Sequence, residues 1–270
     1  MAIQEKVVQN DLILWEIVRH SVLCGEFIRN IDKTEWEPEF KYDYYQKEML
    51  CDFNSYVSIS TARAIGKTIA LVSLIVWGLI NNIFPEDYFV YTIPNKAHLQ
   101  PVWEGLVRDF RSNSFLKNFI NSAKGINASD YRITLLNNAR VFCRIAGQTG
   151  TGAPVVGLHS PFELLDESYY YPWGTFVEFT PTLNTFTQGF RKIIAGVPTG
   201  LRENCVGYVC DMDDSSYTKH RVSALQNPRF TEEDRLRAIE QYGGEDSEDY
   251  IHLVLGEHGS PIFAVFDRRL

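Results

Sequence analysis

The sequence has no long hydrophobic run and no secretory leader, and each absence excludes a class of protein. The longest apolar stretch, residues 69–80, is interrupted by Ser73 and is too short to cross a bilayer. The first residues, 1–12, show no cationic start followed by an apolar stretch, so we expect no signal peptide. These patterns predict a protein that neither spans a membrane nor is secreted.

The sequence also has few cysteines, and it has fewer basic than acidic side chains. The five cysteines are odd in number and scattered, which favours reduced thiols over a disulfide framework. His20 and Cys24 lie four residues apart on an expected helix, but no other metal-binding side chains follow nearby, so we expect no zinc site. The net charge of −8 argues against a protein coated in nucleic acid, although local basic patches are compatible with it.

Alternating strand and helix patterns in the middle of the chain predict an α/β fold with a mainly parallel sheet. Residues 132–136 and 140–146 flank an Asn-Asn-Ala turn, which is typical of a hairpin. The segment 205–212, CVGYVCDM, is interpreted as a further strand. The remaining short strands are expected at 56–60, 88–93, 162–166 and 191–197, with helices at 67–82 and 95–112.

Regions of different character flank this core. An amphipathic pattern predicts one helix over residues 5–30, and a second helix is expected within 42–53. The tail is more polar and carries one helix, begun by Thr231 and ended at Gly243. We therefore divide the chain into an N-terminal helical segment (1–55), an α/β core (56–212) and a small lid subdomain with a linker (213–270).

A phosphate-binding loop is indicated where a β-rich run meets a long apolar helix. Gly66 and Lys67 precede a threonine there, and Lys67 would reach the β- and γ-phosphates of a nucleotide. A lysine at the positive end of a helix is disfavoured unless an anion joins it, which favours a phosphate site. The Thr68 hydroxyl is a hard oxygen ligand that suits Mg²⁺. The full window is Thr61, Ala62, Arg63, Ala64, Ile65, Gly66, Lys67 and Thr68, with Thr61 at the position that is usually glycine.

An acidic pair ends the expected strand at 162–166, about a hundred residues after the loop. Asp166 is predicted to hold Mg²⁺, as the carboxylate at a strand end does in P-loop NTPases. Glu167, directly after it, is placed to orient and deprotonate an attacking water. Glu163 is unusual because it interrupts the apolar part of the strand.

Four separated segments, in this order and spacing, resemble the ATPase domain of the large subunit of tailed-phage DNA-packaging terminases. They are YYQKEML around Gln46, TARAIGKT at 61–68, FELLDES at 162–168 and IIAGVPTG at 193–200. The resemblance covers roughly residues 40–210 and implies a RecA-like (ASCE) P-loop NTPase fold.

The resemblance also implies a role for individual residues in ATP hydrolysis with Mg²⁺. Gln46 would recognise the adenine edge, since its amide offers one donor and one acceptor. Arg63 would stabilise charge on the γ-phosphate, as an arginine finger does. Asp166 and Thr68 would hold the metal, Glu167 would be the catalytic base and Lys67 would bind phosphate. Pro198, Thr199 and Gly200 would form the coupling motif. This motif would pass the state of the γ-phosphate to the parts of the motor that grip DNA.

For the whole protein, the resemblance implies a motor that packages double-stranded viral DNA. Its partners would be the DNA, a portal protein and a small terminase subunit, with copies of the chain forming a ring on the portal. It would act in the host cytoplasm, transiently bound to the procapsid. Terminase large subunits also carry a nuclease domain, and the acidic segment 210–216 is expected to be a strand-end loop rather than a nuclease site. We therefore expect an isolated motor domain, whose basic residues Arg108, Arg111, Lys117, Lys124, Arg140 and Arg144 are candidates for DNA or subunit contacts but are expected to be solvated.

Two other functions remain open on the residues alone. A superfamily 2 helicase-like ATPase shares the acidic strand end and the glutamine motif, but such enzymes normally carry a second RecA-like domain. A non-catalytic nucleotide-binding module could use ATP as a structural ligand while it docks other packaging proteins. Strand separation by the chain would favour the first, and absence of Mg²⁺-dependent phosphate release would favour the second.

Overall fold

The computed structural model describes residues 13–85, 88–121, 123–146, 159–174, 176–177, 186, 189–200 and 205–259. Within these residues, eight strands form a sheet in the order β3-β4-β5-β2-β6-β7-β1-β8. The pairs from β5 through β2, β6, β7 and β1 to β8 are parallel, and those joining β3, β4 and β5 are antiparallel. The strands are β1 Tyr56–Thr61, β2 Tyr88–Ile93, β3 Ile126–Asn127, β4 Arg132–Thr134, β5 Arg140–Ile145, β6 Phe162–Leu165, β7 Arg191–Gly196 and β8 Thr218–Val222.

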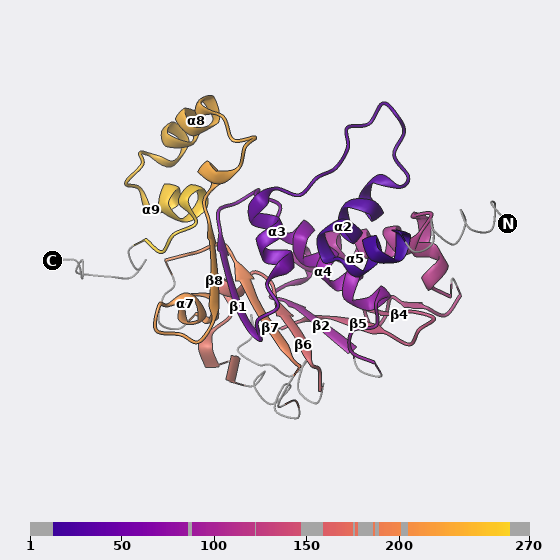
Figure 1. Ribbon diagram of the computed structural model, residues 1–270. Coiled ribbons are helices and arrows are strands. Elements are labelled where there is room, and N and C mark those ends of the chain that lie inside the picture. Colours follow the sequence, from indigo (N-terminus) through magenta and orange to yellow (C-terminus); the bar gives the residue numbers. More distant parts are fainter. Residues whose placement is uncertain are drawn as a thin grey trace.

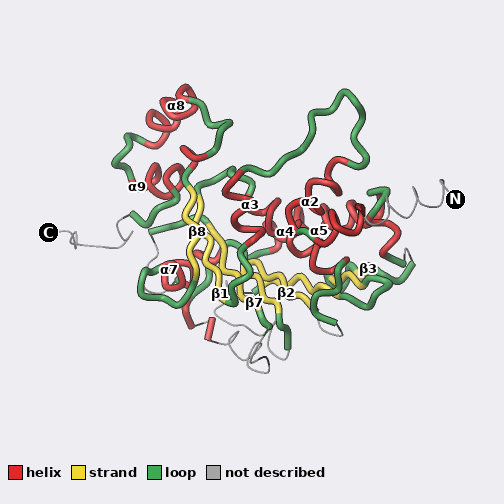
Figure 2. The backbone as a smooth tube through the Cα atoms, in the orientation of Figure 1, coloured by secondary structure: helices red, strands yellow, loops and turns green. Residues whose placement is uncertain are grey.

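Helices cover both faces of this sheet, as Figures 1 and 2 show. The helices α2 to α5 pack on one face, and α7 packs on the opposite face. The predicted architecture, a mainly parallel sheet flanked by helices, is confirmed. The longer helices are α2 Ser21–Asn30, α3 Tyr44–Cys51, α4 Lys67–Ile80, α5 Lys96–Ser112, α7 Val206–Asp211 and α8 Glu232–Tyr242. The short turns are η1 Leu116–Phe119, η2 Ser168–Tyr170, η3 Ala224–Gln226, α9 Glu248–Tyr250 and the π-helical η4 Ile251–Leu255.

The larger hydrophobic cluster lies between the sheet and helices α2 to α5, and a smaller one includes Val206 and Cys210 of α7 on the opposite face. Helix α4 is central to the larger cluster, because most of its side chains are buried, including Leu71, Leu74 and Ile75. An apolar helix of this kind is expected where neighbours surround it on all sides. Its first residue, Lys67, is the exception, since it is charged and only 6 % exposed. Within the described part of the chain, no helix has the length and apolar character that crossing a bilayer requires.

Most of the predicted elements are confirmed, including the four short strands, the two helices between them and the antiparallel hairpin of β4 and β5. The prediction of one continuous helix over 5–30 is wrong in one respect, because the helix is interrupted at His20. Residues 13–19 are helical, and α2 begins anew after His20, whose side chain accepts a hydrogen bond from the Leu23 N–H. Residues 1–12 lie outside the described residues.

The strand expected at 205–212 is wrong, because Val206–Asp211 forms helix α7. Its buried residues recur at helical spacing, since Val206, Gly207, Cys210 and Asp211 all face the protein interior. A Cβ at position 207 would lie 2.7 Å from the Tyr169 ring, so glycine allows the helix to approach η2 closely. A short apolar run has the same composition in a buried strand and in a short buried helix, and the sequence pattern alone does not separate them.

The part of the chain after residue 212 contributes more to the fold than its polar composition suggests. Strand β8 pairs in parallel with β1 along its whole length and extends the sheet beyond the expected core boundary. The predicted helix after Thr231 is confirmed as α8, which ends at Gly243 in the left-handed conformation. We call residues 223–259 the C-terminal unit, and it lies beyond the upper ends of β1 and β8 (Figure 1).

The unusual acidic residue of β6 has a partner. Glu163 is fully buried, and its carboxylate lies 2.9 Å from the ammonium of Lys192 on neighbouring strand β7. The Lys192 ammonium also lies 4.2 Å from the centre of the Phe176 ring. A buried carboxylate requires such compensation, since an isolated charge in the interior is costly.

Candidate functional site

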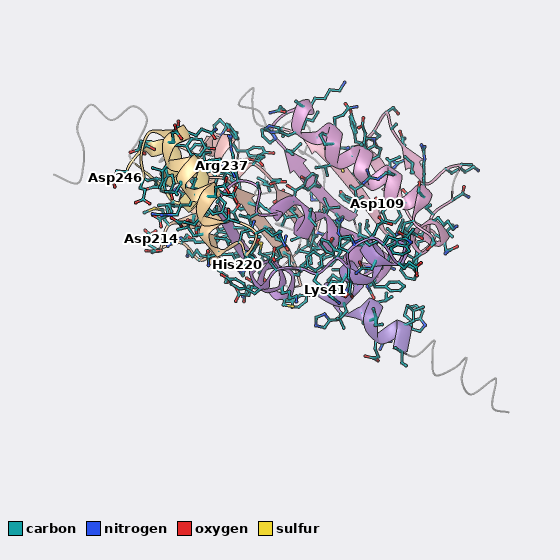
Figure 3. All side chains as sticks on the ribbon, turned by 90° about the horizontal axis from the view of Figure 1, so that it is seen from above. Lys41, Asp109, Asp214, His220, Arg237 and Asp246 are labelled. Atoms are coloured by element: carbon teal, nitrogen blue, oxygen red, sulfur yellow. The ribbon has the colours of Figure 1, made fainter. Side chains whose placement is uncertain are left out.

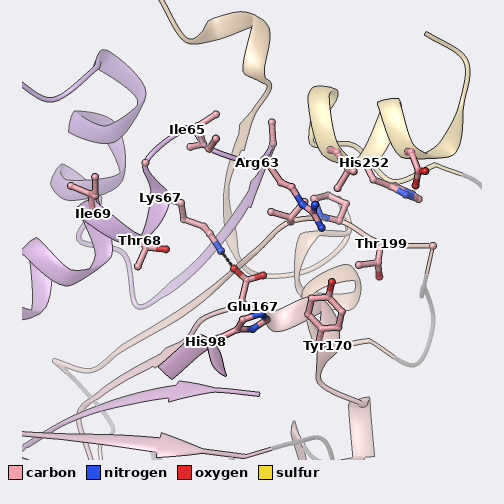
Figure 4. A pocket seen from close by; sticks show the side chains of 18 residues that line it. Arg63, Ile65, Lys67, Thr68, Ile69, His98, Glu167, Tyr170, Thr199 and His252 are labelled. Atoms are coloured by element: carbon pink, nitrogen blue, oxygen red, sulfur yellow. Dashed lines mark hydrogen bonds and ion pairs between the residues drawn. The ribbon is translucent and has the colours of Figure 1, made fainter. Parts of the chain in front are cut away.

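A cavity of about 600 Å³ opens where the carboxyl ends of the central parallel strands meet. Strand β7 lies between β1 and β6, so the segments that follow these three strands converge at one edge of the sheet. Ligands bind at this edge in open α/β sheets. The cavity is lined by residues 62–69 and 197–200, by His98, Glu167 and Tyr170, and by Asp249, His252 and Leu253 (Figure 4).

Residues 62–66 form the loop between β1 and α4, and its backbone is anchored on one side by distant parts of the chain. The Ala62 N–H donates to the Val222 carbonyl at the end of β8, and the Arg63 N–H donates to the Leu253 carbonyl in η4. Ala64 and Gly66 have positive φ angles of 59° and 78°. This backbone leads into the N-terminus of α4, where unpaired N–H groups and the helix dipole favour an anion.

Lys67 reaches across the cavity to the acidic pair. Its ammonium lies 2.6 Å from an Asp166 carboxylate oxygen. It also lies 3.2 Å from Glu167 Oε1, the contact drawn as a dashed line in Figure 4. Burial by itself would lower the pKa of Lys67, but the two carboxylates outweigh it and raise that pKa above its ordinary value. Lys67 is therefore charged, and the predicted phosphate-binding and acidic residues meet in space.

Asp166 is held rigidly at the end of β6 and is only 1 % exposed. The Tyr91 hydroxyl donates to its Oδ2 at 2.8 Å, and the Glu167 N–H donates to its Oδ1 at 2.9 Å. Its own N–H donates to the Thr92 carbonyl on β2. These contacts leave the carboxylate little freedom to turn.

Glu167 has an uncommon backbone conformation, with φ of 54° and ψ of 41°. A non-glycine residue in this left-handed region is strained, and such strain is concentrated at functional sites. The side chain is 23 % exposed and points into the cavity, which Arg63 and His98 also line (Figure 4). The carboxylate can therefore contact both solvent and a bound molecule.

The donors for a metal ion are partly in place. The Thr68 hydroxyl and the carboxylates of Asp166 and Glu167 are hard oxygen atoms grouped around one cavity, which is the donor chemistry that Mg²⁺ prefers. The residues present therefore fit the ion. Thr68 lines the cavity, whereas Asp166 lies just beneath its surface.

The predicted coupling motif lies on the far side of the cavity from α4. Pro198, Thr199 and Gly200 follow β7 and line the cavity wall, and Thr199 lies below the Arg63 side chain in Figure 4. Because β7 is the strand between β1 and β6, its carboxyl end is adjacent to both the loop and the acidic pair. The motif thus lines the same cavity as the loop and Glu167.

Gln46 occupies a different place from the other predicted residues. It is 4 % exposed and is not among the residues that line the described cavity. Its Oε1 accepts from the Asp43 N–H, and its Nε2 donates to the carbonyls of Ile65 and Gly66. In this structure the Gln46 amide supports the loop from behind, and its contact with an adenine base stays a prediction.

Besides Ile69 and Val197, which directly adjoin predicted site residues, five lining residues were not anticipated from the sequence. His98 and Tyr170 follow β2 and β6. Because residues after the carboxyl ends of parallel strands are expected near a ligand site, these two could have been predicted from the sequence. Asp249, His252 and Leu253 belong to the C-terminal unit, and no local pattern indicates that this unit returns to the loop. They are found only from the tertiary structure.

Replacing Gly66 tests the geometry of the loop. A Cβ at this position would lie 2.4 Å from Gln46 Nε2, and the φ of 78° disfavours any L side chain. We expect Gly66→Ala to weaken nucleotide binding at least tenfold. Backbone strain of roughly 1–2 kcal/mol at this position would reduce the affinity by about that factor. Isothermal titration with ADP measures this.

The matched control is Gly105→Ala within α5, where a Cβ meets nothing within 4 Å. That change is expected to leave binding unaltered and to stabilise the fold slightly, because alanine is the better helix former. Equal nucleotide affinity in the two variants would contradict the loop geometry described above.

No family model and no curated protein matches this sequence. Solved structures do match. The HK97 bacteriophage large terminase superimposes with a TM-score of 0.69 at 17 % identity, covering 89 % of this chain and 55 % of that one. The large terminase ATPase domain of Thermus phage P74-26 gives a TM-score of 0.57 at 12 % identity, covering 81 % and 94 %.

This chain has the fold of a large-terminase ATPase domain. A third structure, the large terminase of a thermophilic bacteriophage in complex with ADP, agrees with a TM-score of 0.54 at 15 % identity, covering 76 % of this chain and 48 % of that one. The chain therefore spans about half the length of two of these terminases and most of the isolated P74-26 ATPase domain. The resemblance found in the four sequence segments is confirmed at the level of fold.

Proposed function

We propose that this chain is a Mg²⁺-dependent ATPase that powers the translocation of double-stranded viral DNA into a procapsid. The observation that carries the proposal is the position of Lys67, which lies within hydrogen-bonding distance of both Asp166 and Glu167 in the cavity beside the loop. The terminase fold supports the same conclusion.

In the proposed reaction, the ATP phosphates enter the loop and Lys67 exchanges its carboxylate partners for phosphate oxygens. Bound Mg²⁺, held by Thr68 and Asp166, would neutralise phosphate charge. Glu167 is then free to accept the proton of the attacking water, and the phosphate–oxygen bond to ADP breaks. Arg63 stabilises charge that develops on the γ-phosphate. Recognition of adenine by Gln46 would require its amide nitrogen to leave the Ile65 and Gly66 carbonyls.

The coupling step follows from the position of the motif at 198–200. When the γ-phosphate leaves, Thr199 loses a phosphate group as its neighbour in the cavity. Because the motif directly follows β7, it is connected rigidly to the sheet. In the proposed motor, this change is passed to the surfaces that grip DNA, in a ring of copies bound to a portal protein. The small terminase subunit is a further proposed partner, and the host cytoplasm is the proposed location.

The function is tested by phosphate release from ATP with Mg²⁺ and with excess chelator. We expect release only with Mg²⁺, because the phosphate charge and the carboxylates otherwise repel each other. Lys67→Ala supplies the background rate. If the wild-type chain with Mg²⁺ does not exceed that background while it still binds ATP, the chain is a nucleotide-binding assembly module.

A further inference from the structure

The C-terminal unit and the phosphate loop are connected by a chain of polar contacts outside the cavity. Its first contact joins Arg229, in the segment before α8, to Asp43, the N-cap residue of α3. The guanidinium approaches both carboxylate oxygens, with Arg229 Nη1 3.2 Å from Asp43 Oδ1 and Nη2 paired with Oδ2. The Asp43 side chain is 8 % exposed, so water competes little at its end of this pair.

The second contact runs from Asp43 to the loop. The Tyr45 hydroxyl lies 3.0 Å from Asp43 Oδ2 and 3.2 Å from the Ile65 carbonyl, and the ring is 1 % exposed. Gln46 accepts from the Asp43 N–H and donates to the carbonyls of Ile65 and Gly66. Both side chains of α3 that hold the loop from behind are therefore tied to Asp43.

The C-terminal unit also holds the other end of the same loop directly. The Leu253 carbonyl accepts from the Arg63 N–H at 3.0 Å, and the Gly256 carbonyl accepts from the Ser60 hydroxyl at 3.2 Å. Gly256 itself is packed closely, because a Cβ there would lie 2.5 Å from the Ala62 nitrogen. The unit thus contacts one side of the segment 62–66 directly at Ala62 and Arg63, and reaches the other side at Ile65 through Asp43 and Tyr45.

We propose that Asp43, Tyr45 and Arg229 are positioning residues that couple the placement of the C-terminal unit to the conformation of the phosphate loop. Arg229 keeps the unit docked against α3, and the docked unit holds the Arg63 amide through Leu253. Tyr45 and Gln46 hold the opposite side of the loop at Ile65. When the Arg229–Asp43 pair opens, the loop loses support on both sides together, so nucleotide affinity depends on a residue outside the cavity.

The test compares Arg229→Gln, Asp43→Asn and the double variant with the wild-type chain. Asparagine is a good N-cap, so Asp43→Asn removes the charge without removing the start of α3. The matched control is Arg237→Gln, because Arg237 is also an exposed arginine of the C-terminal unit but pairs with Glu233 and Asp234 on its own helix. Figure 3 shows Arg237 at the end of the molecule away from Asp109.

The first measurement is hydrogen exchange of the peptide that spans residues 61–68, which requires no nucleotide and no activity. We expect exchange of its protected amides to rise about tenfold in each single variant, since a charge-assisted hydrogen bond is worth roughly that factor. The double variant is expected to match the singles, because both changes break one contact. Arg237→Gln is expected to match the wild-type chain.

The second measurement is the affinity for ADP, and this part rests on the proposed function. We expect affinity to fall about fivefold to tenfold in the same variants and in Tyr45→Phe, which removes the hydroxyl between Asp43 and Ile65. Arg229→Lys, which keeps the charge, is expected to restore part of the affinity. Exchange no faster than in Arg237→Gln, or single-variant effects that add in the double variant, would overturn the coupling. Absence of ADP binding by the wild-type chain would instead overturn the proposed function and leave the exchange result to decide the coupling.

Discussion

Glu167→Gln is expected to bind ATP nearly as well as the wild-type chain but to hydrolyse it roughly 10²–10⁴ times more slowly. In the proposed reaction the Glu167 carboxylate accepts the proton of the attacking water, and the amide that replaces it cannot do so. We expect Lys67 to keep its contact with Asp166, which is 2.6 Å in the wild-type chain, so the proposed phosphate-binding contacts should remain intact. Single-turnover phosphate release and a nucleotide titration separate the two effects.

The control for this variant is Glu104→Gln on α5. Glu104 is exposed and accepts a hydrogen bond from Gln100 four residues earlier, outside the cavity. It is expected to leave hydrolysis unchanged. Turnover near the wild-type value in Glu167→Gln would remove Glu167 from the chemistry, and a matching loss of nucleotide affinity would assign it to binding instead.

Lys192→Met is expected to lower the free energy of unfolding by about 3–5 kcal/mol near neutral pH. Methionine is one atom shorter than lysine and uncharged, so it fills most of the space but leaves the Glu163 carboxylate buried without its ion-pair partner. Removal of one member of a buried pair is costly because the remaining charge is neither solvated nor compensated. Urea denaturation followed by tryptophan fluorescence measures the change.

The loss should also depend on pH. Burial raises the pKa of Glu163, and Lys192 opposes that rise, so the variant has a still higher folded-state pKa. The folded variant then binds more protons than the unfolded chain as pH rises from about 4.5, the ordinary value for a glutamate, and its stability falls across that window. We therefore expect a smaller deficit at about pH 5 than at about pH 8.

Replacing both partners supplies the comparison. Glu163→Leu combined with Lys192→Met removes the two charges together, and apolar pairs in such positions are often as stable as the ion pair. The double variant should therefore recover most of the lost stability. A single variant as stable as the double one, at all pH values, would show that Glu163 is not buried as a charge.

The strand–loop–helix arrangement at 61–68 and the acidic pair at a strand end were predictable because each is a short, contiguous pattern. Residues 61–68 join a β-rich run to an apolar helix, and Asp166 and Glu167 end another strand, so their chemistry is set by neighbours in the sequence. The same holds for α8, whose start at Thr231 and end at Gly243 are local capping signals. The helix α7 was missed because a short apolar run has no distinguishing period.

By itself, the sequence determined which residue types stand at the strand ends, where most helices begin and stop, and that the sheet is mainly parallel. Only the tertiary structure decided which of these residues meet. Lys67 and Asp166 are 99 positions apart, and Asp43 and Arg229 are 186 apart. Contacts at such separations depend on how the strands order themselves and on where the C-terminal unit docks. Those arrangements follow from the packing of the whole chain, because no local propensity carries information about a partner so distant in sequence.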